Sequence, residues 1–306
     1  ARGDFMRSHA LNKKYQMAMQ RFAKDETIGL EIGPMHIPYV ERTEGNNIFY
    51  TDWQSTEDLK KQNINNPELD VDDIVDIDFI WDPKKKITEC TPLKFDYIVA
   101  SQVVEHIPDM IGWMQQLFDV LRPGGVLTLG IPDKRYTFDA YRNSTTPAEI
   151  IETYVREEKI PTIRQIYDNC KNAIVVCGDA KVNTEMPFDN YQHLYTPEEA
   201  LNFATYSYFH QKYLDIHCTV CTPDEFQEAI TEIVRLGFLS CEMEVEEIAD
   251  SGSFVAYLTK VKDVVRTLPP SRERQFTHEL NHVHAAHNEG SILKNIFNAT
   301  FKWWRS

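Results

Sequence analysis

Acidic and glycine residues recur directly after successive apolar runs of the chain. Glu31 and Gly33 close the first such run, Asp52 closes the second and Asp78 the third. The carboxyl ends of parallel strands meet at one edge of a sheet, and ligands bind there. Since glycine lets the backbone approach a ligand and carboxylates accept hydrogen bonds, these residues predict one shared ligand site.

Each residue type suggests a part of a nucleoside ligand. Glu31 suits a cationic amine, Asp52 suits both hydroxyls of a ribose, and Asp78 suits the exocyclic amine of a purine. Phe79 offers an aromatic ring to the flat face of that purine. A further segment with polar and ionisable residues, Ser101 to Asp109, follows the fourth apolar run. The predicted binding residues are Glu31, Gly33, Pro34, Asp52, Asp78, Phe79 and Ser101.

Histidine and cysteine residues offer a second kind of chemistry. Asp215 and His217 alternate along an extended segment, which aims both side chains to one side. A structural histidine that bonds to a neighbour is the alternative interpretation. Cys218 and Cys221 form a single C-x-x-C without a second pair at zinc spacing, so we assign no metal ligands.

Strands and helices alternate along the part of the chain that carries these residues. A short apolar run that meets Gly33-Pro34 predicts a buried strand and a turn, and Gly124-Gly125 separates a helical segment from another strand. The pattern predicts an α/β fold with a seven-stranded, mostly parallel, doubly wound sheet that ends in an antiparallel hairpin. The expected strands are 28–32, 47–51, 73–77, 95–100, 126–131, 238–248 and 253–261.

Four regions follow from this pattern. We expect an N-terminal amphipathic helix within 1–27, a core formed by 28–135 and 222–262, and a mostly helical cap over 136–221. Residues 263–306 form a linker and a basic amphipathic segment, which suits an anionic membrane surface, a partner protein or the chain's own domain.

Composition narrows the classes of partner. The formal net charge is −15, from 32 basic and 47 acidic residues, and such a surface repels nucleic acids. No apolar run reaches membrane-span length, the first residues lack the apolar stretch of a secretion signal, and the six cysteines are sparse. We therefore expect a cytoplasmic protein, with the C-terminal segment as a candidate peripheral contact to the inner face of the membrane.

Five motifs together resemble the class I S-adenosylmethionine-dependent methyltransferases. They are LEIGP, FYTDW, VDIDF, FDYIVASQVVEHIPD and LRPGGVLTLGIPD, and the resemblance covers about 28–135 and 222–262. It implies S-adenosylmethionine as the cofactor and places Glu105 and His106 near the transferable methyl group. Pro34, Met35 and His36 stand where the family has further glycines, so the turn differs, and a dinucleotide with its pyrophosphate is disfavoured.

Three segments resemble a bacterial branch of this family that is often encoded with glycosyltransferases in cell-surface polysaccharide clusters. These segments are EIGPMHIP, IPDKRYTFD and DIHCTVCTPDEF. This resemblance implies O-methylation of a sugar hydroxyl on a polysaccharide or its precursor. Such a hydroxyl needs a general base, for which we predict His217, with Asp215 or Asp133 to orient it and His106 as the alternate base. The competing hypotheses are another small acceptor, such as a phenol or an amine, and a non-catalytic module that recruits glycosyltransferases through the C-terminal segment.

Overall fold

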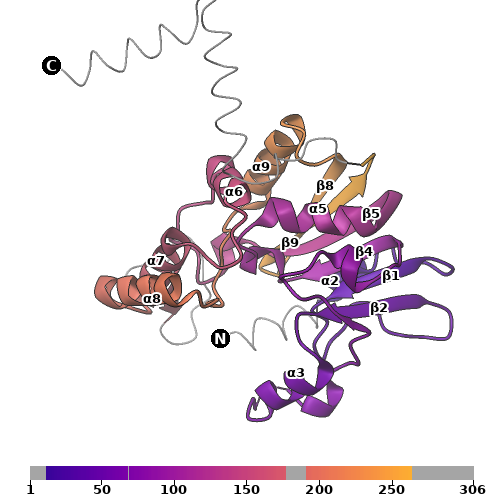
Figure 1. Ribbon diagram of the computed structural model, residues 1–306, viewed down its shortest axis with the longest axis horizontal. Helices are drawn as coiled ribbons and strands as arrows, with labels where there is room; N and C mark the ends of the chain where they lie inside the picture. The colour runs from indigo at the N-terminus through magenta and orange to yellow at the C-terminus, as the bar shows by residue number, and fades with distance from the viewer. Residues whose placement is uncertain (1–11, 68, 177–190, 264–306) are drawn as a thin grey trace, which may run out of the picture. The chain divides into compact units, whose positions relative to one another are not determined.

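A single seven-stranded sheet forms the centre of the structure, a computed structural model that describes residues 12–67, 69–176 and 191–263. The strand order is β3-β2-β1-β4-β5-β9-β8, and β9 runs antiparallel to both of its neighbours while the other pairings are parallel (Figure 1). The predicted fold class is confirmed. The strands are β1 Ile28–Ile32, β2 Asn47–Asp52, β3 Phe79–Ile80, β4 Phe95–Ser101, β5 Leu121–Pro132, β8 Cys241–Ile248 and β9 Ser253–Lys260.

The prediction of the third strand was wrong. Residues 73–77 are not a strand: Val71–Asp73 form a 3-10 turn, and β3 begins only at Phe79. Its two residues pair with Thr51 and Asp52 at the carboxyl end of β2. The alternation of apolar and acidic residues in 73–77 looked like a strand, but this segment only leads the chain to the sheet edge.

The helices begin where side-chain caps favour them. Thr222 caps α9, its hydroxyl accepts from the Glu225 backbone, and Pro223 occupies the first turn. Thr196 caps α8 in the same way. The helices are α2 Lys13–Met19, α3 Thr56–Asn63, α4 Ile87–Cys90, α5 Met110–Val120, α6 Pro147–Val155, α7 Ile163–Asn172, α8 Pro197–His210 and α9 Pro223–Arg235, with 3-10 turns η1 Val71–Asp73, η2 Val104–His106 and η3 Lys134–Tyr136.

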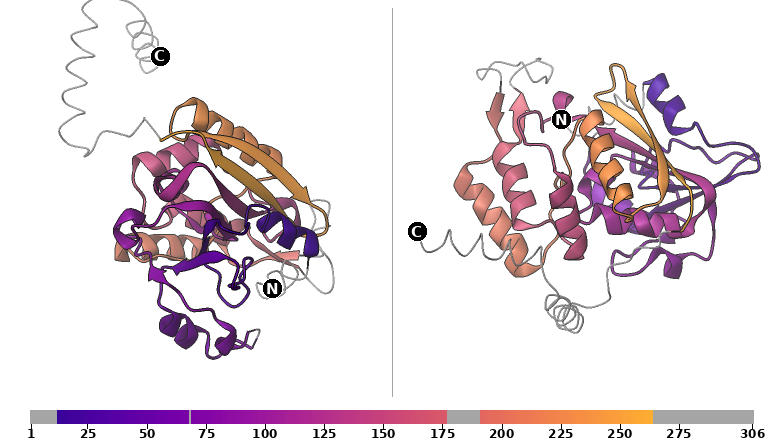
Figure 2. Two further views of the ribbon diagram at one scale, coloured as in Figure 1. Left: turned by 90° about the vertical axis from the view of Figure 1, so that its right-hand side faces the viewer. Right: turned by 90° about the horizontal axis from the view of Figure 1, so that it is seen from above.

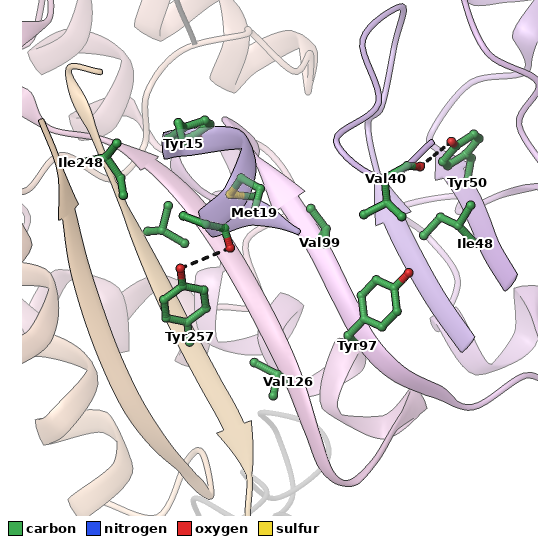
Figure 3. Close-up of a cluster of buried hydrophobic side chains, with 12 residues drawn as sticks. Tyr15, Met19, Val40, Ile48, Tyr50, Tyr97, Val99, Val126, Ile248 and Tyr257 are labelled. Atoms are coloured by element: carbon green, nitrogen blue, oxygen red, sulfur yellow. Dashed lines mark hydrogen bonds between the residues drawn. The ribbon is translucent and has the colours of Figure 1, made fainter. Parts of the chain in front are cut away.

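Side chains alternate between the two faces of the sheet. Figure 3 shows one face, on which Tyr15 and Met19 of α2 lie with Val99, Val126 and Tyr257 from β4, β5 and β9. The Tyr257 hydroxyl donates to the Ala18 carbonyl, 3.2 Å away, which ties α2 to β9. On the opposite face α9 packs on β9, since its Phe226 ring lies 5.7 Å from Phe254. Both faces of the sheet are therefore buried, as its apolar strands require.

The predicted cap region, 136–221, contains α6, α7 and α8 and also an antiparallel pair of strands, β6 Ile174–Val176 and β7 Tyr191–His193. Helices α7 and α8 lie side by side next to the sheet (Figure 1; Figure 2, right) and share a small core formed by Ile166, Cys170, Ala200 and Ala204. The described residues of this region therefore form three helices and one strand pair, and the strand pair was not predicted from the sequence.

Two sequence predictions fall largely outside the described residues. The described part of the N-terminal region contains α2, whereas residues 1–11 are not described. The basic C-terminal segment lies outside the described residues after position 263. Among the helices that the structure describes, none combines the length and the apolar character that a membrane crossing requires.

Candidate functional site

A pocket lies at the point where the sheet changes direction. Strands β1 and β4 are neighbours, yet the chain continues from β1 to one side of the sheet and from β4 to the other. Such a switch point leaves a crevice at the carboxyl ends of the two strands. The pocket is lined by 31–37 and Tyr39 from the β1 side and by Ser101 and Gln102 from the β4 side.

Glu31 lies at the buried end of this pocket. Its side chain is only 2% exposed, and its two carboxylate oxygens accept hydrogen bonds from the backbone of Tyr39 (2.8 Å) and Val40 (3.0 Å). Burial raises its pKa to about 7, although those two hydrogen bonds oppose the shift. Glu31 therefore holds the loop 33–40 in place and keeps a carboxylate at the pocket, where a cation would favour its ionised form.

Gly33 begins that loop in a left-handed conformation. Its φ is +66°, and its amide donates to the Thr51 carbonyl of β2, 2.9 Å away. Side chains with a Cβ rarely adopt this φ, so the turn explains the glycine. Pro34 and Met35 continue the turn, and Met35 also has a positive φ, of 51°. The chain therefore makes this turn without the further glycines that class I methyltransferases have in this motif.

Ser101 ends β4 beneath helix α2. Its hydroxyl lies 2.7 Å from the hydroxyl of Tyr15, which is fully buried. A methyl group on Gly130 of β5 would lie 2.0 Å from the same Tyr15 oxygen, so the glycine makes room for the tyrosine. Burial raises the pKa of Tyr15 well above its ordinary value. No sequence motif pointed to Tyr15 as a site residue, since it lies outside all of them.

Asp52 ends β2 beside the Gly33 turn. Its side chain is 7% exposed, one carboxylate oxygen accepts from the Gln54 amide at 3.1 Å, and burial raises its pKa to about 6. Asp52 does not line the pocket itself, but Gly33 bonds to the residue before it. A ribose that extends from the pocket along β2 would meet this carboxylate.

The structure places Asp78 and Phe79 farther along the edge. One Asp78 carboxylate oxygen accepts from the Tyr50 amide at 2.6 Å and from the Arg42 guanidinium. Together with Phe79, Asp78 lines a separate open depression beside the start of α3. Asp78 thus stabilises the path of the chain into β3, and its predicted contact with a purine stays a prediction.

His217 has a buried carboxylate as its partner. Its Nδ1 lies 2.5 Å from Asp139 Oδ2, and the other oxygen, Oδ1, accepts a hydrogen bond from Arg142 at 2.7 Å. Although burial alone would raise the pKa of Asp139, the charges of His217 and Arg142 hold it at about 2. Arg142 also donates to Asp168 (2.8 Å) and to the His217 carbonyl (3.0 Å). The imidazole is therefore fixed in orientation, with Nδ1 on the carboxylate.

His106 and Asp215 join the same cluster. Nδ1 of His106 lies 2.9 Å from an Asp215 oxygen, and the His106 ring is edge-on to the ring of His217, with 4.8 Å between centroids. Glu105, which is 1% exposed, stands beside them with one oxygen 3.8 Å from His106 Nε2. Asp215 and His217 thus both lie against His106.

The orienting residue of His217 was predicted wrongly. Asp215 contacts His106 instead, and Asp133 forms a bidentate pair with Arg135, whose nitrogens lie 3.0 and 2.5 Å from its oxygens. Asp139 orients His217 instead, and it follows the strand-five motif by only a few residues. Its partner His217 is 78 positions away in the sequence, so the pairing depends on how the cap docks. The Asp139–Arg142 spacing was the available signal, and it was missed.

The cluster and the pocket share one loop. Ser101 and Gln102 line the pocket, and Glu105 and His106 in η2 follow at once. The backbone carbonyl of Glu105 accepts from the amides of Cys218 (2.6 Å) and Thr219 (3.2 Å), which docks the segment of His217 against this loop. A ligand in the pocket and an acceptor at the histidines would therefore meet along 101–106.

Comparison with known proteins identifies the family of the chain. A family model described as a methyltransferase domain matches residues 16–230. The chain belongs to this methyltransferase family. S-adenosylmethionine is accordingly the cofactor of this methyltransferase, and the predicted activity is confirmed at that level.

Individual relatives are distant. The human mitochondrial ubiquinone biosynthesis O-methyltransferase is 29% identical over 128 residues, which cover 40% of this chain and only 34% of the human enzyme. A possible histamine N-methyltransferase from Thermotoga maritima has 13% identity and a TM-score of 0.40, covering 84% of this chain and 91% of its own. The plantazolicin methyltransferase BamL, solved with SAH, has 12% identity and a TM-score of 0.42, covering 85% and 89%.

The pocket residue Glu31 and the neighbouring Asp52 have side-chain chemistry that fits this cofactor. S-adenosylmethionine carries a sulfonium and an ammonium group, and Glu31 and Asp52 supply two buried carboxylates whose pKa values burial raises to about 7 and 6. A bound cation offsets the cost of ionising such groups. Gly33 leaves its own backbone open to a ligand, so Glu31, Gly33 and Ser101 would hold the methionine part and Asp52 the ribose.

Proposed function

We propose that this methyltransferase transfers the methyl group to a hydroxyl oxygen of a sugar, on a cell-surface polysaccharide or its precursor. The observation that carries the proposal is the buried His217–Asp139 pair, next to the loop that lines the cofactor pocket. An imidazole oriented by a carboxylate is suited to remove a proton from a hydroxyl, which must lose it to become a methyl ether.

The cluster sets out the roles in the reaction. The cofactor supplies an electrophilic methyl group, and the acceptor oxygen forms the new bond to that carbon as the carbon–sulfur bond breaks and its electron pair stays on sulfur. Asp139 fixes Nδ1 of His217, so the other ring nitrogen can take the hydroxyl proton. Arg142 holds Asp139 ionised and in position. Alignment of the acceptor with the methyl carbon provides the remaining rate enhancement.

Three observations bear on the acceptor. The human relative over part of the chain is an O-methyltransferase by name. The motifs IPDKRYTFD and DIHCTVCTPDEF, which resemble the polysaccharide-associated branch, contain Asp139 and His217 themselves. The net charge of −15 disfavours a polyanionic acceptor. A neutral sugar hydroxyl therefore suits the cluster better than a nucleic acid.

An acceptor screen with methyl-labelled S-adenosylmethionine tests this function. Sugars, nucleotide sugars and oligosaccharides are compared with phenols and amines, and mass spectrometry locates the added methyl group. We expect transfer to a sugar oxygen by the wild-type chain and by His210→Ala, an exposed histidine of α8 that serves as the control, but not by His217→Ala. Transfer to a phenol or an amine alone would contradict the sugar assignment.

A further inference from the structure

We propose that Glu105, His106 and His217 together bind one divalent transition-metal ion. One ligand atom from each of these three side chains lies within 4.8 Å of the other two. One pair, Glu105 Oε1 and His106 Nε2, is 3.8 Å apart. Ligand atoms that share an ion at about 2.0–2.2 Å stand roughly 3–3.6 Å from one another, so small side-chain movements complete the site.

Each imidazole has a carboxylate oxygen near its Nδ1 atom, and for His217 this contact is a hydrogen bond. Nδ1 of His217 lies 2.5 Å from Asp139, and Nδ1 of His106 lies 2.9 Å from Asp215. When Nδ1 donates to a carboxylate, Nε2 keeps the lone pair that a metal ion needs. The centroids of the two imidazole rings are 4.8 Å apart, and each ring has a carboxylate near its Nδ1 atom. A histidine with a purely structural role would not need this paired arrangement.

The backbone around the three ligands is held by its own hydrogen bonds. The carbonyl of Glu105 accepts from the Cys218 amide at 2.6 Å, and the carbonyl of His106 accepts from the Tyr213 hydroxyl at 3.0 Å. The His217 carbonyl accepts from Arg142 at 3.0 Å. Such support orients ligands before the ion arrives, which lowers the entropic cost of binding.

The ligand types indicate which ion would bind. Two imidazole nitrogens and one carboxylate oxygen suit Zn²⁺ and the neighbouring transition metals, whereas Mg²⁺ and Ca²⁺ favour oxygen ligands. Three protein ligands also leave a coordination position open, as catalytic sites require. An acceptor oxygen could take that position.

This inference rests on the proposed function for what the ion acts on, and it changes the part played by His217. A hydroxyl bound to the ion loses its proton to solvent near neutral pH, so the ion activates the acceptor and His217 serves as a ligand instead of the proton acceptor. The bond changes at carbon and sulfur are the same as before.

Metal titration of the full chain tests the site without any acceptor. The protein is stripped with a chelator and titrated with Zn²⁺ by calorimetry and with Co²⁺ by visible absorption. We expect one ion per chain and a loss of at least about tenfold in affinity for Glu105→Gln and His106→Ala. His210→Ala should keep wild-type affinity, and so should Cys218→Ser, which tests whether the adjacent thiol is a ligand.

Three outcomes separate this inference from the proposed function. Absence of binding in the wild-type chain, or unchanged affinity in both Glu105→Gln and His106→Ala, overturns the metal site even if methyl transfer proceeds. Specific binding without transfer to any sugar leaves the metal site standing and rejects the acceptor. Glu105→Gln keeps the shape of the side chain, and its thermal unfolding confirms that a lost ion is not a lost fold.

Discussion

The cofactor pocket and the histidine cluster are built in different ways. The pocket comes from residues that directly follow β1 and β4, two neighbouring strands of the core. The cluster joins the loop after β4 to the segments around Asp139, Asp168 and His217, which the sheet itself does not bring together. The pocket is thus a consequence of the fold, whereas the cluster depends on how the inserted region docks. Substitutions in the pocket should therefore change cofactor affinity, whereas substitutions in the cluster should change the rate of methyl transfer.

The largest effect is expected from His217→Ala. Loss of the imidazole removes the proton acceptor of the proposed function, or one ligand of the proposed ion, and should lower kcat by about 10²–10⁴-fold with cofactor affinity unchanged. Single-turnover transfer and calorimetry with S-adenosylhomocysteine measure the two quantities, with His210→Ala as the control. A parallel loss of cofactor affinity would show that the two regions are not independent.

Asp139→Asn should damage both activity and stability. The change leaves the buried Arg142 with one carboxylate partner fewer, and breaking a buried ion pair costs about 3 kcal/mol of unfolding free energy. The pKa of Asp139 is held at about 2, below its ordinary value, so its stabilisation is present above pH 4 and is lost as the pH falls toward 2. Urea unfolding at several pH values checks this, and a variant as stable as wild type at neutral pH would contradict the pairing.

Gly130→Ala should destabilise the pocket side. The new methyl group would lie 2.0 Å from the Tyr15 hydroxyl, and such overpacking costs about 1–3 kcal/mol. Tyr15→Phe removes that oxygen, so the double variant should recover part of the loss. Thermal unfolding of the four proteins in this cycle gives the coupling energy. Strict additivity would mean that α2 does not pack against β5 as the structure shows.

Cofactor affinity should rise with pH. Burial raises the pKa of Glu31 to about 7 and of Asp52 to about 6, so each carboxylate loses its proton, and becomes attractive to a cation, only as the pH passes that value. We expect up to about tenfold per pH unit between pH 5 and 7, with a flatter profile for Glu31→Gln.

In the ligand-free chain, the same two carboxylates have the opposite effect on stability as the pH rises. The folded state holds these protons more tightly than the unfolded state, so the free energy of unfolding should fall as the pH rises through this range. Calorimetry at a series of pH values measures the affinities, and urea unfolding measures the stability. A flat affinity profile for the wild-type chain would remove both carboxylates from the cofactor site.

The smallest effect is expected from Asp133→Asn. Because Asp133 pairs with Arg135, away from His217, the change should leave kcat within about twofold of wild type. Steady-state kinetics beside His217→Ala measure this. A loss as large as that of the histidine variant would restore the role that the sequence suggested for Asp133.

The same contrast explains what the sequence could predict. Strand periodicity placed β1, β2, β4, β5 and the final hairpin, and therefore Glu31, Gly33, Asp52 and Ser101 at the sheet edge. It misplaced β3, because a two-residue strand has no periodicity to read. Asp139 could not be matched to His217, since a contact across 78 residues depends on tertiary packing rather than on local spacing.

A crystal structure with S-adenosylhomocysteine tests the central claim, which is that the crevice between β1 and β4 holds the cofactor with its sulfur toward His106 and His217. We predict the methionine part against Gly33 and Ser101, the ribose at Asp52, and the sulfur on the side of η2. A nucleoside in the depression beside α3, or a sulfur that faces away from the histidines, would contradict the account.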